Sequence, residues 1–293
     1  MKTRHSYGIM LFRINPKTEK PELFLMQRRC TYAFMSFAHG DYNVHFNNRA
    51  NLIVYVQKLF NGMTLTELEF IRSLNFDFIW MHMWKHYIDS SESIKKLKIV
   101  SLNHFNRLLN IIGKDSFINL IQMVSIPNEL WWEPPKGKQK KGENKYVTAI
   151  REFEEETGIS KSKYIIIPQY EFKYSYIDEG TNYVITYFMG IANKSLNSFV
   201  NKSGSVITSN IIDKYTEGCA FKFMENGTYK NLLYSVSRKL LYNKIMCATL
   251  IFSYYRRYRP LIKFDVFASE FSKKNKFNAF AIPFKPLKAQ SCQ

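Results

Sequence analysis

Three glutamates stand at helical spacing in the middle of the chain and could carry chemistry. Glu152, Glu155 and Glu156 follow one another within the stretch KYVTAIREFEEETG. On a helix with 3.6 residues per turn these three side chains share one face, whereas Glu154 points away from it. Their repulsion costs an isolated helix about 0.2–0.5 kcal/mol per pair, which a divalent cation would offset. Mg²⁺ and Mn²⁺ suit such hard oxygen ligands and bridge them to substrate phosphates. The spacing therefore predicts a metal site, although an arbitrary run of glutamates is more often a solvated helix face.

A lysine-rich loop that contains glycine, PPKGKQKKGENK, comes directly before this helix. The chain as a whole carries 42 basic and 24 acidic residues, a formal net charge of +18. Such an excess indicates a polyanionic partner: nucleic acid, a phosphate-rich small molecule or an anionic membrane surface. The loop lysines suit a long anionic substrate, and a purely solvated loop is the alternative. The candidate phosphate- and RNA-binding residues of the loop are Lys136, Lys138, Lys140 and Lys141.

The loop and the helix together fill a known motif. The complete Nudix box is identified here, and it consists of Gly137, five residues, Glu143, seven residues and then REFEEETGI. The resemblance implies an α/β fold, the Nudix α/β/α sandwich with a mixed sheet, and hydrolysis of a diphosphate bond linked to another moiety. It also implies that Glu143 and Arg151 orient the loop and the helix. The catalytic metal ligands implied by the resemblance are Glu152, Glu155, Glu156 and the carbonyl of Gly137 or its neighbour.

A further carboxylate downstream of the box often serves enzymes of this family as a metal ligand or base. Glu217, just before the last expected strand, is the choice here, ahead of Glu225 and Glu179. The resemblance thus adds Glu217 as a fourth candidate catalytic residue.

Two features narrow the resemblance to the mRNA-decapping Nudix enzymes of large DNA viruses, of the poxvirus, asfarvirus and giant-virus kind. The box opens with PKGK where many relatives have a proline and two glycines, a variant similar to decapping enzymes and to diadenosine-tetraphosphate hydrolases. A helical stretch is inserted before the box and is approached by QRRCTYAFMSFAHGDY, as in the viral enzymes. The sequence departs from that pattern at 39–41, His-Gly-Asp, where a more basic sequence is expected.

The viral resemblance implies a metal-dependent hydrolase that cleaves the cap pyrophosphate of mRNA. Its products would be 7-methyl-GDP and RNA with a 5′ monophosphate, and its cofactor Mg²⁺ or Mn²⁺. It further implies a virus-encoded, cytoplasmic protein that shuts off host messages or times viral ones. Inositol pyrophosphates and dinucleoside polyphosphates are alternative substrates, and the rival from another class is an RNA-binding protein that keeps the fold without catalysis.

Aromatic and basic residues could bind the RNA and its cap. A methylated guanine is flat and cationic, so a cap pocket commonly holds it between two aromatic rings. The candidates for stacking are Tyr32, Phe34, Phe37, Tyr176 and Tyr183. The distal segment SYYRRYRP could stack on unpaired bases and contact phosphates, or its tyrosines could pack on the core while its arginines face water. Its candidate phosphate-binding residues are Arg256, Arg257 and Arg259.

The pattern of apolar residues predicts the elements that position these groups. Strands are expected at 7–14, 22–27, 128–133, 170–177, 183–191 and 219–224. Helices are expected as several short segments between 50 and 123, at 145–156 and at 229–242. The chain is therefore divided into a Nudix domain at 1–40 and 124–260, a helical insertion at 41–123 and a basic tail at 261–293.

The sequence also argues against other chemistries. His82 and His86 are four residues apart, but a third zinc ligand is not evident, so they are interpreted as packing or surface residues. A serine hydrolase would need an elbow such as GxSxG, which the sequence lacks. The four cysteines form no CxxC pair, and the longest apolar run near the end, 245–255, is about half a membrane span. We therefore expect reduced thiols, an intracellular protein and no stable membrane insertion.

Overall fold

The strands predicted from alternating apolar residues assemble into one mixed sheet. The computed structural model describes residues 2–84, 92–178, 180–201, 204–206, 218–225 and 236–258. Within these residues seven strands follow the order β3-β2-β1-β6-β5, with β4 paired to β1 and β7 paired to β2. β1 and β6 run parallel, and the other neighbours are antiparallel. The strands are β1 (Lys2–Ile14), β2 (Pro21–Arg28), β3 (Trp132–Glu133), β4 (Lys136–Lys138), β5 (Tyr164–Asp178), β6 (Thr181–Ala192) and β7 (Gly218–Glu225).

Short polar turns set the register of the sheet. Between β1 and β2 the Asn15 side chain accepts hydrogen bonds from the backbone N–H groups of Lys17 and Thr18, 2.9 and 3.3 Å away. The hairpin then places Arg13 opposite Glu22, and the two form a buried ion pair of 2.6 Å. Such side-chain bonds to the backbone favour turns over continued strand.

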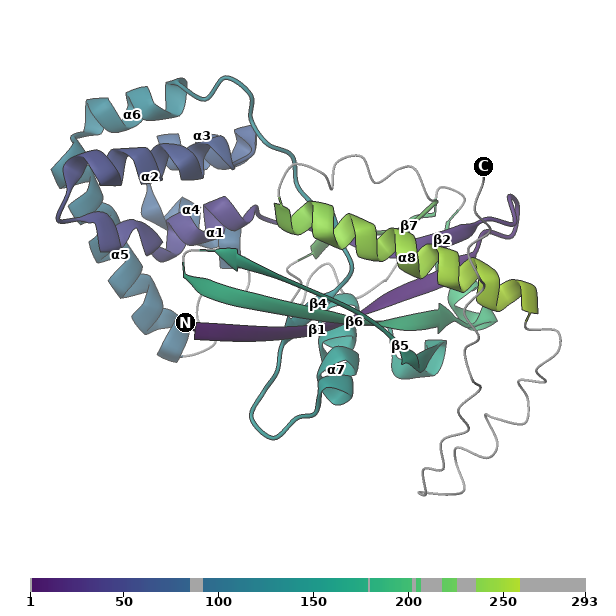
Figure 1. The fold of residues 1–293 in the computed structure, drawn as a ribbon. Coiled ribbons are helices and arrows are strands. Elements are labelled where there is room, and N and C mark those ends of the chain that lie inside the picture. Colours follow the sequence, from purple (N-terminus) through teal and green to yellow (C-terminus); the bar gives the residue numbers. More distant parts are fainter. Residues whose placement is uncertain are drawn as a thin grey trace, which may run out of the picture. The chain divides into compact units, whose positions relative to one another are not determined.

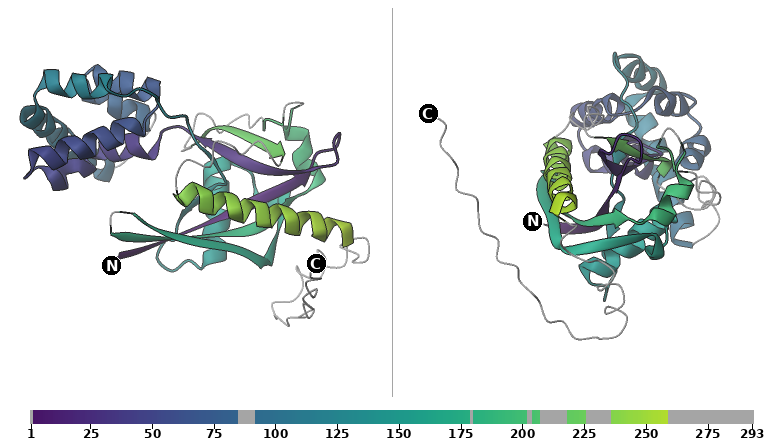
Figure 2. Two further views of the ribbon diagram at one scale, coloured as in Figure 1. Left: turned by 45° about the horizontal axis from the view of Figure 1, so that its top comes forward. Right: turned by 90° about the vertical axis from the view of Figure 1, so that its right-hand side faces the viewer.

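Between β2 and β3 the chain builds a helical core of its own. Its buried residues run from Cys30 to Ile121, and α1 to α6 gather into one group in Figures 1 and 2. Phe34 and Phe37 of α1 belong to this core, so the helical insertion begins near residue 30 rather than at the predicted 41. The helices of the described chain are α1 (Tyr32–His39), η1 (Asp41–His45), α2 (Arg49–Asn61), α3 (Leu65–Arg72), α4 (Phe76–Trp84), α5 (Glu92–Ile112), α6 (Lys114–Gln122), α7 (Lys145–Thr157), η2 (Lys161–Lys163), η3 (Lys194–Phe199) and α8 (Val236–Tyr258).

Helices cover both faces of the sheet. Leu11 of β1 lies in a core with Phe153 of α7, whereas the next residue, Phe12, stacks on Phe252 of α8 with 5.0 Å between ring centroids. Successive side chains of a strand point to opposite faces. Helices α7 and α8 therefore lie on opposite faces of the sheet (Figure 1), and the predicted α/β/α sandwich is confirmed.

The distal part of the chain is described in part. Two compact units divide at 252/253, and of the second unit the structure describes the end of α8, residues 253–258. The predicted tail at 261–293 and the start of the predicted helix at 229–235 lie outside the described residues. In the part of the chain that is described, no helix combines the length and the apolar character needed to cross a membrane.

Candidate active site

Helix α7 begins and ends as its sequence predicts. The Asn144 side chain accepts hydrogen bonds from the N–H groups of Tyr146 and Val147, and Gly158 ends the helix in the left-handed region at φ 62°. Both features are standard helix caps. The buried Phe153 packs against Phe24 and Tyr164, with ring centroids 5.6 and 5.1 Å apart. This apolar contact fixes the rotation of α7, so that its glutamates face the lysine-rich loop.

Arg151 joins the loop to the helix. Its guanidinium donates two hydrogen bonds to Glu143, from Nε at 2.6 Å and from Nη2 at 2.9 Å. Nη2 also donates to the Lys138 carbonyl at 3.0 Å. The bond from Arg151 is the main cause that lowers the pKa of the Glu143 carboxyl to about 2. Paired bonds of this kind combine strength with fixed geometry, so Glu143 and Arg151 hold the loop against α7.

The same guanidinium reaches two of the three predicted metal ligands. Arg151 Nη1 donates to Glu152 Oε1 at 2.7 Å and to Glu155 Oε2 at 2.8 Å. Glu155 is the exposed member of the trio and also pairs with Lys140, whose Nζ lies 3.2 Å from Oε1. The sequence predicted the orienting role of Arg151 but not these two additional ion pairs.

Strand β4 supplies the opposite wall of the site. The backbone N–H of Lys136 donates to Glu156 Oε2 at 2.9 Å, and Glu156 is buried. A Cβ on Gly137 would collide with the Glu152 carboxylate. Glycine is therefore required at 137 because a carboxylate occupies the space where a side chain would begin. Tyr7 of β1 pairs with Gly137 and anchors this short strand to the sheet.

The donor set fits a hard divalent cation. Of the three carboxylates, Glu152 fills the space beside Gly137, Glu156 is buried against the Lys136 N–H, and Glu155 is exposed. Oxygen ligands of this kind suit Mg²⁺ or Mn²⁺. In the described chain, however, the oxygens of Glu152, Glu155 and Glu156 do not form a group lying mutually within 4.8 Å. Their charges are balanced by Arg151, Lys140 and the N–H of Lys136 instead.

The Lys136 ammonium is bound by other side chains of the protein. Its Nζ donates to Glu133 Oε1 and to the Tyr32 hydroxyl, both at 3.1 Å, and its side chain is only 14% exposed. Arg28 of β2 binds the same Glu133 oxygen at 2.9 Å. Burial raises the pKa of Glu133, but the charges of Lys136 and Arg28 outweigh burial and lower it to about 2. The prediction for the Lys136 ammonium is therefore corrected: it is part of a buried ion network.

The other loop lysines remain at the surface. Lys138, Lys140 and Lys141 are exposed, and Lys140 contacts Glu155. The network of Arg28, Glu133 and Lys136 was missed from sequence. The one available signal was Glu133, the second of two glutamates in the strand-like stretch NELWWE, because an acidic residue needs a partner once it is buried.

The structure separates the five candidate stacking rings. Phe34 and Phe37 are at most 1% exposed, because neighbouring helices cover them, so their proposed role in stacking on a cap is corrected to packing in the helical core. Tyr32 is 40% exposed, and its hydroxyl donates to Glu133 at 3.1 Å. Tyr176 and Tyr183 face each other across β5 and β6, stacked with 5.2 Å between centroids.

Of the three downstream carboxylates considered as a fourth catalytic acid, the structure describes Glu225. Glu217 and Glu179 lie outside the described residues. Glu225 accepts a hydrogen bond from Thr18 at 2.6 Å and pairs across β2 with Glu22, which faces Arg13 of β1. Arg13 lies six positions along β1 from Tyr7, the residue that pairs with Gly137, which is about 20 Å along a strand. Glu225 is therefore remote from the carboxylate site.

The distal arginines are described incompletely. The part of SYYRRYRP that the structure describes forms the end of helix α8, and Arg256 is exposed there. Arg259 and the side chain of Arg257 lie outside the described residues.

Comparison with known proteins places this site in a family. Residues 107–205 match the family described as NUDIX domain. A protein of African swine fever virus (isolate Pig/Kenya/KEN-50/1950) is 36% identical over 202 residues, which are 67% of this chain and 76% of that protein. The chain therefore belongs to the Nudix family, and with its complete box it is a Nudix pyrophosphohydrolase.

The relatives themselves carry more specific names. The African swine fever virus relative is named mRNA-decapping protein g5R. A protein of Acanthamoeba polyphaga mimivirus, named putative mRNA-decapping protein, is 28% identical over 204 residues, 60% of this chain and 53% of that protein. Among solved structures, a C. elegans Ap4A hydrolase superposes with a TM-score of 0.36 at 14% identity, covering 83% of this chain and 96% of that one.

Proposed function

We propose that this protein removes the 5′ cap from mRNA, releasing 7-methyl-GDP and RNA with a 5′ monophosphate. The observation that carries the proposal is a complete Nudix box in a chain that shares 36% identity with a protein named mRNA-decapping protein g5R, over 76% of its length. The net charge of +18 adds support, because an RNA substrate is a long polyanion. By the same reasoning the protein is virus-encoded and acts in the host cytoplasm.

We assign the metal to Glu152, Glu155 and Glu156, with a carbonyl at Gly137 or its neighbour, and Mg²⁺ or Mn²⁺ as the ion. Bound there, the ion would neutralise phosphate oxygens and lower the pKa of the attacking water. For Glu152 and Glu155 to hold a common ion, both would have to give up their ion pairs with Arg151. Arg151 retains two bonds to Glu143 and one to the Lys138 carbonyl, so the loop stays attached to α7 when those pairs are lost. Glu217 remains the proposed fourth acid.

Substrate contacts are assigned to groups that remain at the surface. Lys138, Lys140 and Lys141 are exposed on the loop, and Lys140 lies beside Glu155, so these lysines suit the phosphates next to the scissile bond. Tyr176 and Tyr183 stack on each other, so a flat cationic base would stack on the outer face of this pair rather than between the two rings. The arginines at 256, 257 and 259 are assigned to the RNA body.

A cap-release assay with matched variants tests this function. RNA labelled in the cap is incubated with the protein and Mn²⁺, and the released nucleotide is identified. We expect 7-methyl-GDP from the wild type and a loss of more than about 100-fold in Glu155→Gln, which retains RNA binding. Glu154→Gln is the control, because this neighbour on α7 accepts its hydrogen bond from the Lys161 N–H rather than facing the site.

The outcomes separate decapping from its rivals. Release of another nucleotide, or equal activity of Glu155→Gln and wild type, would overturn the proposal. Absence of any turnover with intact RNA binding would favour the idle RNA-binding alternative. A competition assay distinguishes a decapping enzyme from one that acts on inositol pyrophosphates. Unlabelled RNA should inhibit a decapping enzyme strongly and an inositol-specific enzyme weakly. The names of the relatives give no support to inositol pyrophosphates as substrates.

A further inference from the structure

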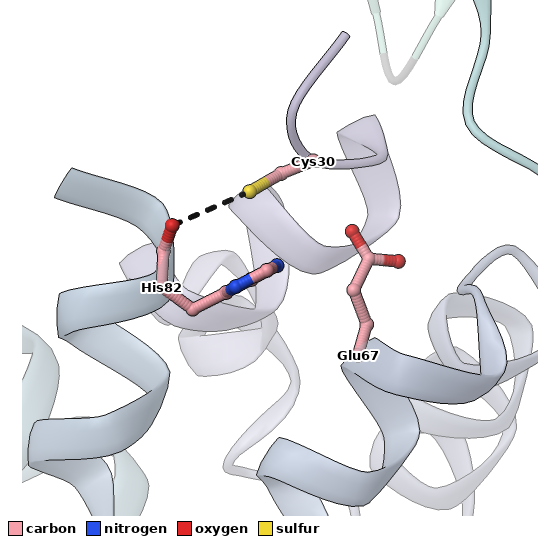
Figure 3. Close-up of side chains that lie close together, drawn as sticks. All are labelled: Cys30, Glu67 and His82. Carbon is pink, nitrogen blue, oxygen red and sulfur yellow. Dashed lines mark hydrogen bonds between the residues drawn. The ribbon is translucent and has the colours of Figure 1, made fainter. Parts of the chain in front are cut away.

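Three side chains of metal-ligand type converge inside the helical core, and none belongs to the Nudix box. The ligand atoms of Cys30, Glu67 and His82 all lie within 4.8 Å of one another. Figure 3 shows the three side chains directed into a common space, from the segment after β2, from α3 and from α4. In the described chain this is the single such group of three or more His, Cys, Asp and Glu residues. No third zinc ligand for His82 is evident from the sequence, and the fold brings Cys30 and Glu67 to it from distant positions.

We propose that Cys30, Glu67 and His82 bind Zn²⁺. A thiolate, an imidazole and a carboxylate are the three ligand types that zinc takes in proteins, and three protein ligands leave a fourth position for water. Ligand atoms about 2.0–2.3 Å from one tetrahedral ion lie about 3.5 Å from each other. Separations of up to 4.8 Å thus close onto an ion with side-chain movements of about 1 Å.

The carboxylate of Glu67 is already held in position. It accepts hydrogen bonds from the Thr31 N–H at 2.7 Å, the Thr31 hydroxyl at 2.9 Å and the Thr64 N–H at 2.8 Å. Hydrogen bonds from a second layer of residues orient metal ligands in this way. Glu67 is 1% exposed, and no lysine or arginine of the described chain forms an ion pair with it. A buried carboxylate without a cationic partner is costly, and a bound cation would supply that partner.

The imidazole and the thiol are equally constrained. The His82 ring stacks on Phe70 with 4.5 Å between centroids and meets Phe34 edge-on at 5.2 Å, which fixes the direction of its nitrogens. The buried Cys30 thiol lies 3.9 Å from the His82 carbonyl oxygen. Zinc binding replaces the thiol proton, which leaves to solvent as the zinc–sulfur bond forms. His82 is half-buried, so this ligand is the member of the cluster that is partly exposed to solvent.

The site would tie three segments of the helical core together. Cys30 lies where the chain leaves β2, and Glu67 and His82 lie on consecutive helices. An ion bound to all three therefore stabilises the start of the insertion against local opening. Its sulfur and nitrogen ligands distinguish it from the carboxylate site on α7, because Mg²⁺ and Mn²⁺ prefer oxygen ligands.

Cobalt and zinc titrations of the full chain test the site. Co²⁺ added to the reduced protein should produce a thiolate-to-cobalt charge-transfer band, which Zn²⁺ abolishes and millimolar-scale Mg²⁺ leaves unchanged. Cys30→Ser should lose the band and weaken zinc binding by at least about 100-fold. Cys219→Ser is the matched control, because this thiol contacts Gln27 and the Arg28 carbonyl instead of the cluster.

A second readout keeps the result independent of any one variant. Zinc should raise the melting temperature of the wild type and of Cys219→Ser but not of His82→Gln, with circular dichroism checking that each variant is folded. The proposal is overturned if the wild type gives no band and no zinc-dependent shift, or if Cys30→Ser and His82→Gln behave as the wild type does.

Discussion

The buried network around Glu133 should make a large and pH-dependent contribution to stability. Glu133 Oε1 lies 2.9 Å from Arg28 Nη1 and 3.1 Å from Lys136 Nζ, and the side chains of Arg28 and Glu133 are 4% and 8% exposed. We consider the substitution Glu133→Gln, which preserves shape but leaves two cations without their shared carboxylate. Breaking a buried pair in this way costs about 3–5 kcal/mol of unfolding free energy.

The pKa of Glu133 leads to the same magnitude by another route. Lys136 and Arg28 outweigh burial and lower this pKa from 4.5 to about 2. Each pKa unit is worth about 1.4 kcal/mol, so the shift corresponds to about 3 kcal/mol of stability. Because the folded pKa is depressed, this contribution is present above about pH 4.5 and is lost as the pH falls toward 2.

Urea denaturation at several pH values measures this prediction. At pH 7 we expect Glu133→Gln to lower the unfolding free energy by about 3 kcal/mol or more, and the difference from wild type should shrink below pH 4. Glu69→Gln, an exposed glutamate on α3, should change stability by less than about 0.5 kcal/mol and serves as the control. The double variant Glu133→Gln with Lys136→Met should recover part of the lost unfolding free energy, because it removes one of the two buried cations that no longer have a carboxylate partner. A loss below about 1 kcal/mol at pH 7, or a difference that does not depend on pH, would refute the reasoning.

Two further predictions concern the site itself. Gly137→Ala should reduce turnover by about 100-fold with little change in melting temperature, because the added methyl group displaces the Glu152 carboxylate. Steady-state rates in Mn²⁺ measure this effect. An unchanged rate would contradict the explanation given for the glycine. Tyr176→Ala should weaken binding of capped RNA by about 1–3 kcal/mol through loss of stacking beside Tyr183, as measured by fluorescence anisotropy. Phe34→Ala should instead cost about 3–5 kcal/mol of stability and leave the intrinsic affinity for cap unchanged, so a selective loss of cap binding in Phe34→Ala would reverse our assignment.

Local patterns of the sequence predicted the parts of the structure that depend on neighbouring residues. The arc of Glu152, Glu155 and Glu156 follows from helical periodicity, and the Asn144 and Gly158 caps follow from local backbone chemistry. The predicted strands agree with β2, β6 and β7 to within two positions. By contrast, β1 begins at Lys2, β3 is two residues long, β5 begins at Tyr164, six residues earlier than predicted, and β4 was not predicted.

Interactions between distant segments were the part that the sequence could not reveal. Arg28 meets Glu133 from the other side of the entire helical insertion in the sequence, and Thr31 before α1 meets Glu67 of α3. Helix α1 was assigned to the wrong domain because its apolar residues have the same pattern whether they pack on a sheet or on other helices. A periodicity states which side of an element is buried but not which partner buries it.

The parallel pairing of β1 with β6 has a consequence for how the protein is made. Strand β1, Lys2–Ile14, leaves the ribosome well before its parallel partner Thr181–Ala192, and it must wait for that partner before the centre of the sheet can close. The helical core needs only the chain from Cys30 to Ile121, so its apolar residues can be buried while β1 still lacks its partner. During synthesis the inserted segment can therefore take shape ahead of the domain that it interrupts, and a newly made chain would expose the unpaired edge of β1 until β6 arrives.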